Sequence, residues 1–205
     1  RLNNKNEFVP EGNNIILIEI IKDYMNKVIS FDEKHAPFKI LNLEGDKKSG
    51  FIKKYNLSKK NKVNISGFID RIDEKNNKIR IIDYKTGGDS RISKDIKSLF
   101  SNEKKERNDA VFQLLFYSLL VKNSQDKCLS ITPGLINIRQ VKNKISDIRI
   151  IINKKKIDNV LPLLDEFEKY LKVKINEIFD EKIPFTQNED KEECKYCPYK
   201  NMCST

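Results

Sequence analysis

The stretch VNISGFIDRIDEKNNKIRIIDYKT, residues 63–86, decides the fold. It contains two runs rich in Val, Ile, Phe and Tyr, residues 63–73 and 78–85, separated by a polar turn. Asn76 and Asn77 tolerate the positive φ angles that a two-residue hairpin turn requires. The pattern therefore predicts an antiparallel β-hairpin.

The register of this hairpin follows from counting outward from the turn. The expected cross-strand pairs are Lys75–Lys78, Asp73–Arg80, Ile72–Ile81 and Asp70–Asp83. Cβ atoms of such pairs lie about 5 Å apart, so two like charges repel each other. A divalent cation between Asp70 and Asp83 would offset that repulsion. A one-residue slip in the turn would leave the two aspartates diagonal to each other.

Period-two alternation puts Lys85 on the same face of the hairpin as the two aspartates. A cation held by carboxylates polarises a phosphoryl oxygen and lowers the pKa of bound water, and a nearby ammonium orients that water or offsets developing charge. This set of groups fits metal-assisted phosphodiester hydrolysis. The alternative is a surface hairpin whose aspartates face solvent, which the alternating isoleucines disfavour.

Three motifs in order resemble the PD-(D/E)XK nuclease superfamily, in its RecB/AddB-like exonuclease branch: GFID at 67–70, IDYKTG at 82–87 and QLLFY at 113–117. The proline of the superfamily name is absent, as is common in that branch. The resemblance implies a restriction-endonuclease-like core in which Asp70 and Asp83 bind Mg²⁺ or Mn²⁺ and Lys85 is the catalytic lysine. It also implies that Gln113 and Tyr117 belong to an accessory helical motif beside the site.

Composition adds supporting evidence. The chain has 205 residues, 38% hydrophobic and 34% charged, with a formal net charge of +10. This predicts one soluble core with a small appendage, and excess lysine suits a polyanion such as DNA. No apolar run is long enough for a membrane span and no secretory signal is visible, so we expect a cytoplasmic protein with no membrane partner.

The flanking segments complete an α/β pattern, with helices predicted over residues 15–34, 110–121 and 157–179. Residues 38–44 alternate as a strand that ends at Glu44, which resembles a further member of the site; a solvent-facing glutamate is the alternative. Residues 134–141 and 148–152 predict a second hairpin that extends the sheet. We therefore expect a mixed central sheet with an antiparallel catalytic hairpin, flanked by helices.

Gln113 and Tyr117 stand out on the predicted helix 110–121, which is apolar nearly all round. Their i, i+4 spacing places them on one face, where buried polar groups need partners. Those partners are either the site and its substrate or ordinary core hydrogen bonds. The long polar segment 87–107 after the catalytic strand would be a flap over the substrate or partly disordered.

The tail carries three cysteines, Cys194, Cys197 and Cys203, in a C-x2-C-x5-C array. Clustered cysteines in an intracellular chain favour metal ligation over disulfides. The spacing resembles the iron–sulfur module of AddB-like nucleases, which implies a [4Fe–4S] cluster; zinc and unligated thiols are the alternatives. The expected division is a nuclease-like domain over 1–185 and a cysteine-rich tail over 186–205, with the upstream GxxxH segment of the branch missing.

The resulting hypothesis is a divalent-metal-dependent DNA nuclease of exonuclease type, acting in recombination or repair, with a helicase subunit or domain as a candidate partner. One alternative is an inactive nucleic-acid-binding or scaffolding module with the same fold. Another is an endonuclease, which would need a base-reading element that the sequence does not reveal.

Overall fold

The computed structural model describes residues 11–44, 51–56, 62–124, 128–138, 141, 144–184, 194–195 and 197–203. The helices are α1 (Asn13–His35), η1 (Lys97–Phe100, a 3-10 turn), α2 (Asp109–Lys122), α3 (Leu161–Ile178) and the short α5 (Lys200–Cys203). The strands are β1 (Lys39–Leu43), β2 (Phe51–Asn56), β3 (Lys62–Gly67), β4 (Arg71–Lys75), β5 (Lys78–Lys85), β6 (Ile92–Ser93), β7 (Ser130–Asn137), β8 (Ile151–Ile152) and β9 (Lys155–Lys156). The domain boundary predicted at residue 185 lies outside the described residues.

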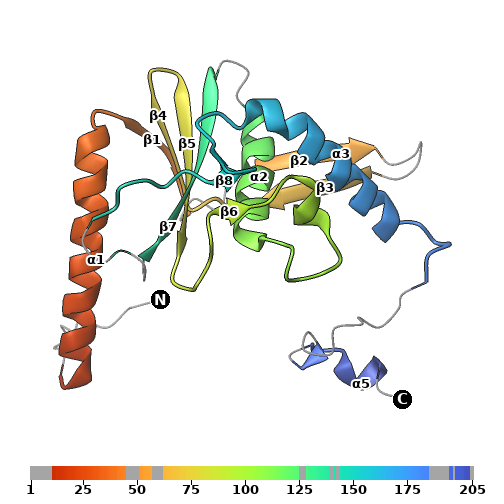
Figure 1. Cartoon of the computed structure of the whole chain (residues 1–205), viewed down its shortest axis with the longest axis horizontal. Coiled ribbons are helices and arrows are strands. Elements are labelled where there is room, and N and C mark those ends of the chain that lie inside the picture. Colours follow the sequence, from red (N-terminus) through yellow and green to blue (C-terminus); the bar gives the residue numbers. More distant parts are fainter. Residues whose placement is uncertain are drawn as a thin grey trace.

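A four-stranded sheet in the order β1-β4-β5-β7 forms the centre of the molecule, between α1 on one side and α2 on the other (Figure 1). β1, β4 and β5 are antiparallel neighbours, whereas β7 runs parallel to β5. Parallel strands need a crossover connection, and α2 supplies it. The predicted mixed α/β architecture is confirmed.

The central hairpin has the predicted turn and register. Asn76 and Asn77 have φ angles of 52° and 59°, as a two-residue turn requires. The predicted pairs Lys75–Lys78, Asp73–Arg80 and Ile72–Ile81 are present. The regular ladder ends at Arg71–Ile82, so Asp70 and Asp83 each lie one residue beyond its last pair, and the predicted Asp70–Asp83 pair is not part of it.

Residues 63–73 are two strands and not the single strand that the sequence predicted. β3 pairs with β2 in a separate two-stranded sheet, and β4 belongs to the central sheet. Residues 68–70 connect the two. Gly67 marks the break, since a Cβ there would lie 2.7 Å from Cε1 of Tyr117, and only glycine permits that approach.

The predicted second hairpin is also wrong in its pairing. A single bridge, Gly134–Arg149, joins β7 to the segment that follows, and β8 pairs with β6 and β9 in a separate sheet. Pro133 gives the physical reason. Its carbonyl accepts the N–H of Ile150 (3.4 Å), but it has no N–H to return the bond, so the ladder does not extend.

α2 is buried between the central sheet and α3, as its apolar sequence predicted. Asn108 caps it, its Oδ1 accepting the N–H of Val111 at 3.0 Å. Phe100 of η1 stacks on Tyr170 and packs against Phe167 of α3. The η1 turn within residues 87–107 therefore belongs to the core around α3, and the flap over the substrate stays a prediction for the rest of that segment.

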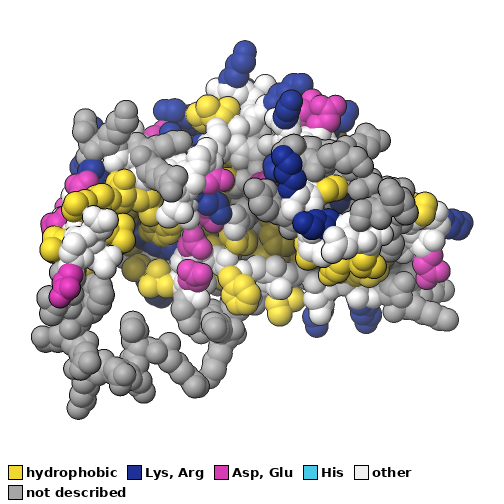
Figure 2. All heavy atoms as spheres, turned by 90° about the horizontal axis from the view of Figure 1, so that it is seen from below, with side chains coloured by type: hydrophobic (Ala, Val, Ile, Leu, Met, Phe, Trp, Pro, Cys, Tyr) yellow, Lys and Arg dark blue, Asp and Glu magenta, His cyan; other side chains and the backbone are white. Residues whose placement is uncertain are grey.

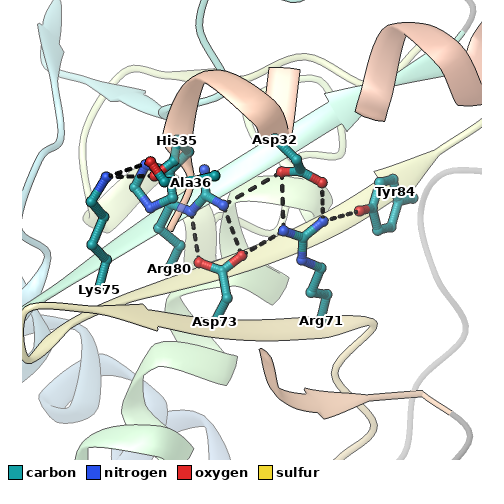
Figure 3. A network of polar contacts seen from close by, with 8 residues as sticks. All are labelled: Asp32, His35, Ala36, Arg71, Asp73, Lys75, Arg80 and Tyr84. Atoms are coloured by element: carbon teal, nitrogen blue, oxygen red, sulfur yellow. Dashed lines mark hydrogen bonds and ion pairs between the residues drawn. The ribbon is translucent and has the colours of Figure 1, made fainter. Parts of the chain in front are cut away.

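A charged network fastens α1 to the face of the hairpin opposite α2 (Figure 3). Asp73 is fully buried, and its carboxylate accepts hydrogen bonds from Arg80 Nε (2.7 Å) and Arg71 Nη2 (2.8 Å). Asp32, from the last turns of α1, binds Arg71 through both carboxylate oxygens. Arg71 also donates to the hydroxyl of Tyr84 at 3.2 Å. The guanidinium groups of Arg71 and Arg80 are thus both paired with Asp73 and Asp32 between the sheet and α1.

The N-terminal two thirds of α1 is much less covered. The helix has no fully buried residue, and its most exposed apolar side chains are Ile15, Ile16, Leu17, Ile20, Ile21, Met25 and Ile29. The amphipathic pattern predicted this helix correctly but not the exposure of its apolar face. Among the described residues, no helix has the length and apolar character that crossing a bilayer requires.

We predict that Gly67→Ala lowers the free energy of unfolding by about 1–3 kcal/mol, because the new methyl group would overlap the ring of Tyr117. Gly88→Ala is the matched control, since a Cβ there meets no atom within 4 Å. Urea unfolding of both variants measures the difference. Equal stability of the two variants would contradict the packing argument.

We predict a larger loss for Asp73→Asn, about 3–5 kcal/mol, because two buried guanidinium groups would lose their shared counter-charge. Asp165→Asn removes an ion pair with Lys122 whose carboxylate is 84% exposed, and its effect on the free energy of unfolding should be much smaller. Thermal and urea unfolding compare the two. Similar losses would mean that the network contributes no more than a surface pair.

Candidate active site

Asp83 and Lys85 lie near the C-terminal end of β5 and face α2. Asp83 is 1% exposed, and Lys85 Nζ lies 3.1 Å from its Oδ2 atom. The same ammonium donates a hydrogen bond to Oε1 of Gln113 at 2.7 Å. β5 and α2 therefore bring together three of the residues that the sequence singled out.

Asp70 is held just beyond the end of the β4–β5 ladder. Its Oδ2 accepts the main-chain N–H of Tyr84 at 2.8 Å, and its main-chain oxygen accepts the N–H of Glu44 at 3.0 Å. The carboxylate thus takes a strand N–H that has no partner in the regular ladder. These bonds fix Asp70 beside the C-terminal half of β5, close enough for its charge to act on Asp83.

The pKa of Asp83 is raised above its usual range, chiefly because burial disfavours the charged carboxylate. Lys85 opposes this shift, and the negative charge of Asp70 adds to it. Oδ2 of Asp83 is buried and receives no hydrogen bond from the described residues, because Lys85 approaches at ion-pair distance without hydrogen-bond geometry. A buried carboxylate oxygen without a donor is costly unless a cation or a proton meets it.

Gln113 and Tyr117 extend the contacts of Lys85 away from the carboxylates. Nε2 of Gln113 donates to the Tyr117 hydroxyl at 2.7 Å. Tyr117 is 8% exposed, and burial raises its pKa, so it stays protonated at neutral pH. Its ring packs against Gly67. The two residues thus position Lys85, and Tyr117 reaches the site only through Gln113.

The donor set fits a hard cation. Asp70 and Asp83 offer carboxylate oxygens, one of them buried and unused. No group of three or more His, Cys, Asp or Glu suited to metal binding forms within the part of the chain that the structure describes. Mg²⁺ needs no such group, since it keeps several waters and binds through one or two carboxylates plus substrate phosphate.

Glu44 and the cysteines are less closely connected to this site. Glu44 approaches Asp70 through its main-chain N–H, and its side chain is exposed. Cys194 and Cys197 are half-buried and linked by a main-chain hydrogen bond, from the Cys197 N–H to the Cys194 oxygen at 3.3 Å. Neither belongs to a metal-binding group among the described residues, so iron–sulfur or zinc ligation stays a prediction without support.

Sequence reasoning missed two contributors, Gly67 and the main-chain N–H of Tyr84. Gly67 allows Tyr117 to pack against the chain just before the site, and Tyr84 anchors Asp70. The glycine in GFID was the available signal, because glycine inside a strand pattern often marks close backbone approach. The Tyr84 contact had no signal, since it is made by the backbone.

Comparison with known proteins gives a family match that covers most of the chain. The model of the PD-(D/E)XK nuclease superfamily matches residues 16–204, and thus includes every site residue discussed above. No curated protein and no solved structure matches the chain significantly. The match covers far more than half of the 205 residues, and the chain belongs to the PD-(D/E)XK nuclease superfamily.

Proposed function

We propose that this protein is a divalent-metal-dependent DNA nuclease whose active site consists of Asp70, Asp83 and Lys85. Membership of the superfamily suggests a metal-dependent nuclease. The observation that carries the assignment to these residues is the buried, donor-free Oδ2 of Asp83 beside Asp70 and Lys85. A cation between the two carboxylates would satisfy that oxygen and offset their repulsion.

Each residue has a distinct role in this proposal. Asp70 and Asp83 would hold Mg²⁺ or Mn²⁺, which when bound polarises the scissile phosphate and acidifies a water. Lys85 Nζ donates a hydrogen bond to Gln113 and lies 3.1 Å from Asp83 Oδ2, so N–H groups of the ammonium remain for the attacking water or a phosphate oxygen. Gln113 and Tyr117 hold the ammonium in place. Glu44 would assist from the rim.

The finer assignment is an exonuclease of recombination or repair, with DNA as substrate and a helicase subunit or domain as partner. It is supported by the likeness of the three motifs to the RecB/AddB-like branch. A linear, end-labelled DNA and a covalently closed circle, each incubated with and without Mn²⁺, test it. Metal-dependent degradation of the linear DNA alone is expected. Discrete cuts in the circle would indicate an endonuclease, and binding without cleavage an inactive module.

Asp83→Asn and Lys85→Ala should each lower cleavage by more than about a hundredfold, since one removes a metal ligand and the other the transition-state cation. Asp83→Asn should also leave the free energy of unfolding unchanged or higher, because it removes a buried charge. Lys78→Ala, at the exposed start of the same strand, is the control. Full activity of either site variant would refute the assignment.

The raised pKa of Asp83 predicts a pH dependence. The carboxylate must be ionised to hold a cation, so cleavage falls as pH drops through this raised pKa. The stability of the metal-free protein should change in the opposite direction. The pKa of this carboxyl is higher in the folded than in the unfolded protein, so the folded protein binds the proton more tightly. The free energy of unfolding therefore rises as pH falls through the folded-state pKa.

The carboxyl ¹³C shift of Asp83, followed against pH in metal-free protein, measures this pKa directly. Asp70→Asn should lower it by removing a nearby negative charge, and Lys85→Ala should raise it by removing a cation. Shifts in the reverse directions would mean that the three groups do not share one electrostatic site.

A further inference from the structure

An exposed aromatic ring stands beside the proposed site without any structural role. Phe68 is 61% exposed and belongs to neither hydrophobic core cluster. No ring contact or cation–π contact of Phe68 occurs among the described residues. Its neighbour Ile69 is 1% exposed and buried in the main core. Packing therefore explains Ile69 but not the outward phenyl ring.

The backbone on both sides of Phe68 is firmly held. Gly67 lies against the ring of Tyr117, which is bound through Gln113 to Lys85. On the other side, Asp70 is fixed by its bonds with Tyr84 and Glu44. The chain of contacts that positions the reactive groups thus also fixes the base of the phenyl ring. The ring is presented from a rigid support.

Chain geometry places this ring close to the carboxylates. Two residues of extended chain span about 7 Å at most, so the Cα atoms of Phe68 and Asp70 lie within that distance. A phosphate bound at Asp70 and Asp83 therefore has its adjoining nucleotides within reach of Phe68. Aromatic side chains in such places bind nucleic acid by stacking on unpaired bases.

We propose that Phe68 is a stacking platform for an unpaired base next to the scissile phosphate, and that the preferred substrate is single-stranded DNA or a frayed DNA end. This inference rests on the proposed function. Paired bases inside a duplex hide their faces against neighbouring pairs, so only an unpaired base meets the ring. On the face seen in Figure 2, the Lys and Arg side chains of the described residues are interspersed with carboxylates.

Binding in EDTA tests the proposal without cleavage. The probe is a short single strand with terminal 2-aminopurine, whose fluorescence reports stacking, and a blunt duplex of the same sequence is the comparison. Phe68→Ala should weaken single-strand binding on the order of ten- to a hundredfold and abolish the stacking signal. Phe68→Trp should keep both, whereas Phe68→Leu, which is apolar without a π face, should not. Phe179→Ala, a similarly exposed phenylalanine after α3, should bind as wild type.

Unchanged binding of Phe68→Ala would overturn the proposal. Wild-type binding and stacking signal in Phe68→Leu would also overturn it, since an apolar side chain without a π face would then be enough for the contact. An equal loss for blunt duplex would exclude the single-strand preference. Failure of the proposed function is seen separately, as the absence of Mg²⁺- or Mn²⁺-dependent cleavage by the wild-type protein whether or not the ring stacks on DNA.

Discussion

The alternation of side chains along the β4–β5 hairpin is the constraint on which the rest of the structure depends. β5 directs Ile81, Asp83 and Lys85 toward α2, and Arg80 and Tyr84 toward α1. β5 therefore supplies both Asp83 of the candidate site and Arg80, one of the two arginines that hold α1 on the other side. A shift of one residue would exchange the two sets and destroy both.

The two faces treat buried charge in opposite ways. Toward α1, Asp73 is fully buried and both of its oxygens accept hydrogen bonds from arginines, so its burial is compensated. Toward α2, Asp83 is just as buried, yet its Oδ2 receives no hydrogen bond from the described residues and the pKa of the carboxyl group is raised. The carboxylate with the weaker compensation, an ion pair with Lys85 alone, is the one at the proposed site.

The sequence predicted correctly the elements that depend on residues close together in the chain, such as turns and helix caps. Asn76-Asn77 fixed the turn, and the turn fixed the register of Ile72 and Ile81. Asn108 and the apolar run after it identified α2, and the i, i+4 spacing placed Gln113 and Tyr117 together. Counting from the same turn singled out Asp70 and Asp83, and the family motifs added the nuclease role expected of them and of Lys85.

Non-local causes escaped prediction. The break between β3 and β4 arises from the contact of Gly67 with a ring fifty residues later in the chain, and the failed second hairpin from the missing N–H of Pro133. Asp32 gave no sign of its arginine partners, since an acid near a helix end normally faces solvent. These features depend on contacts between elements that are far apart in the chain, and a single sequence does not reveal such contacts.

The separation of the two faces has an evolutionary consequence. Asp83 or Lys85 can change without touching the arginine–aspartate cluster that secures α1, so in a duplicated gene a single substitution at the candidate site leaves the fold in place. Changes at Asp73, in contrast, would weaken the fold and with it the support of the candidate site. Among related sequences, substitutions should therefore be more frequent on the face of the hairpin toward α2 than on the face toward α1.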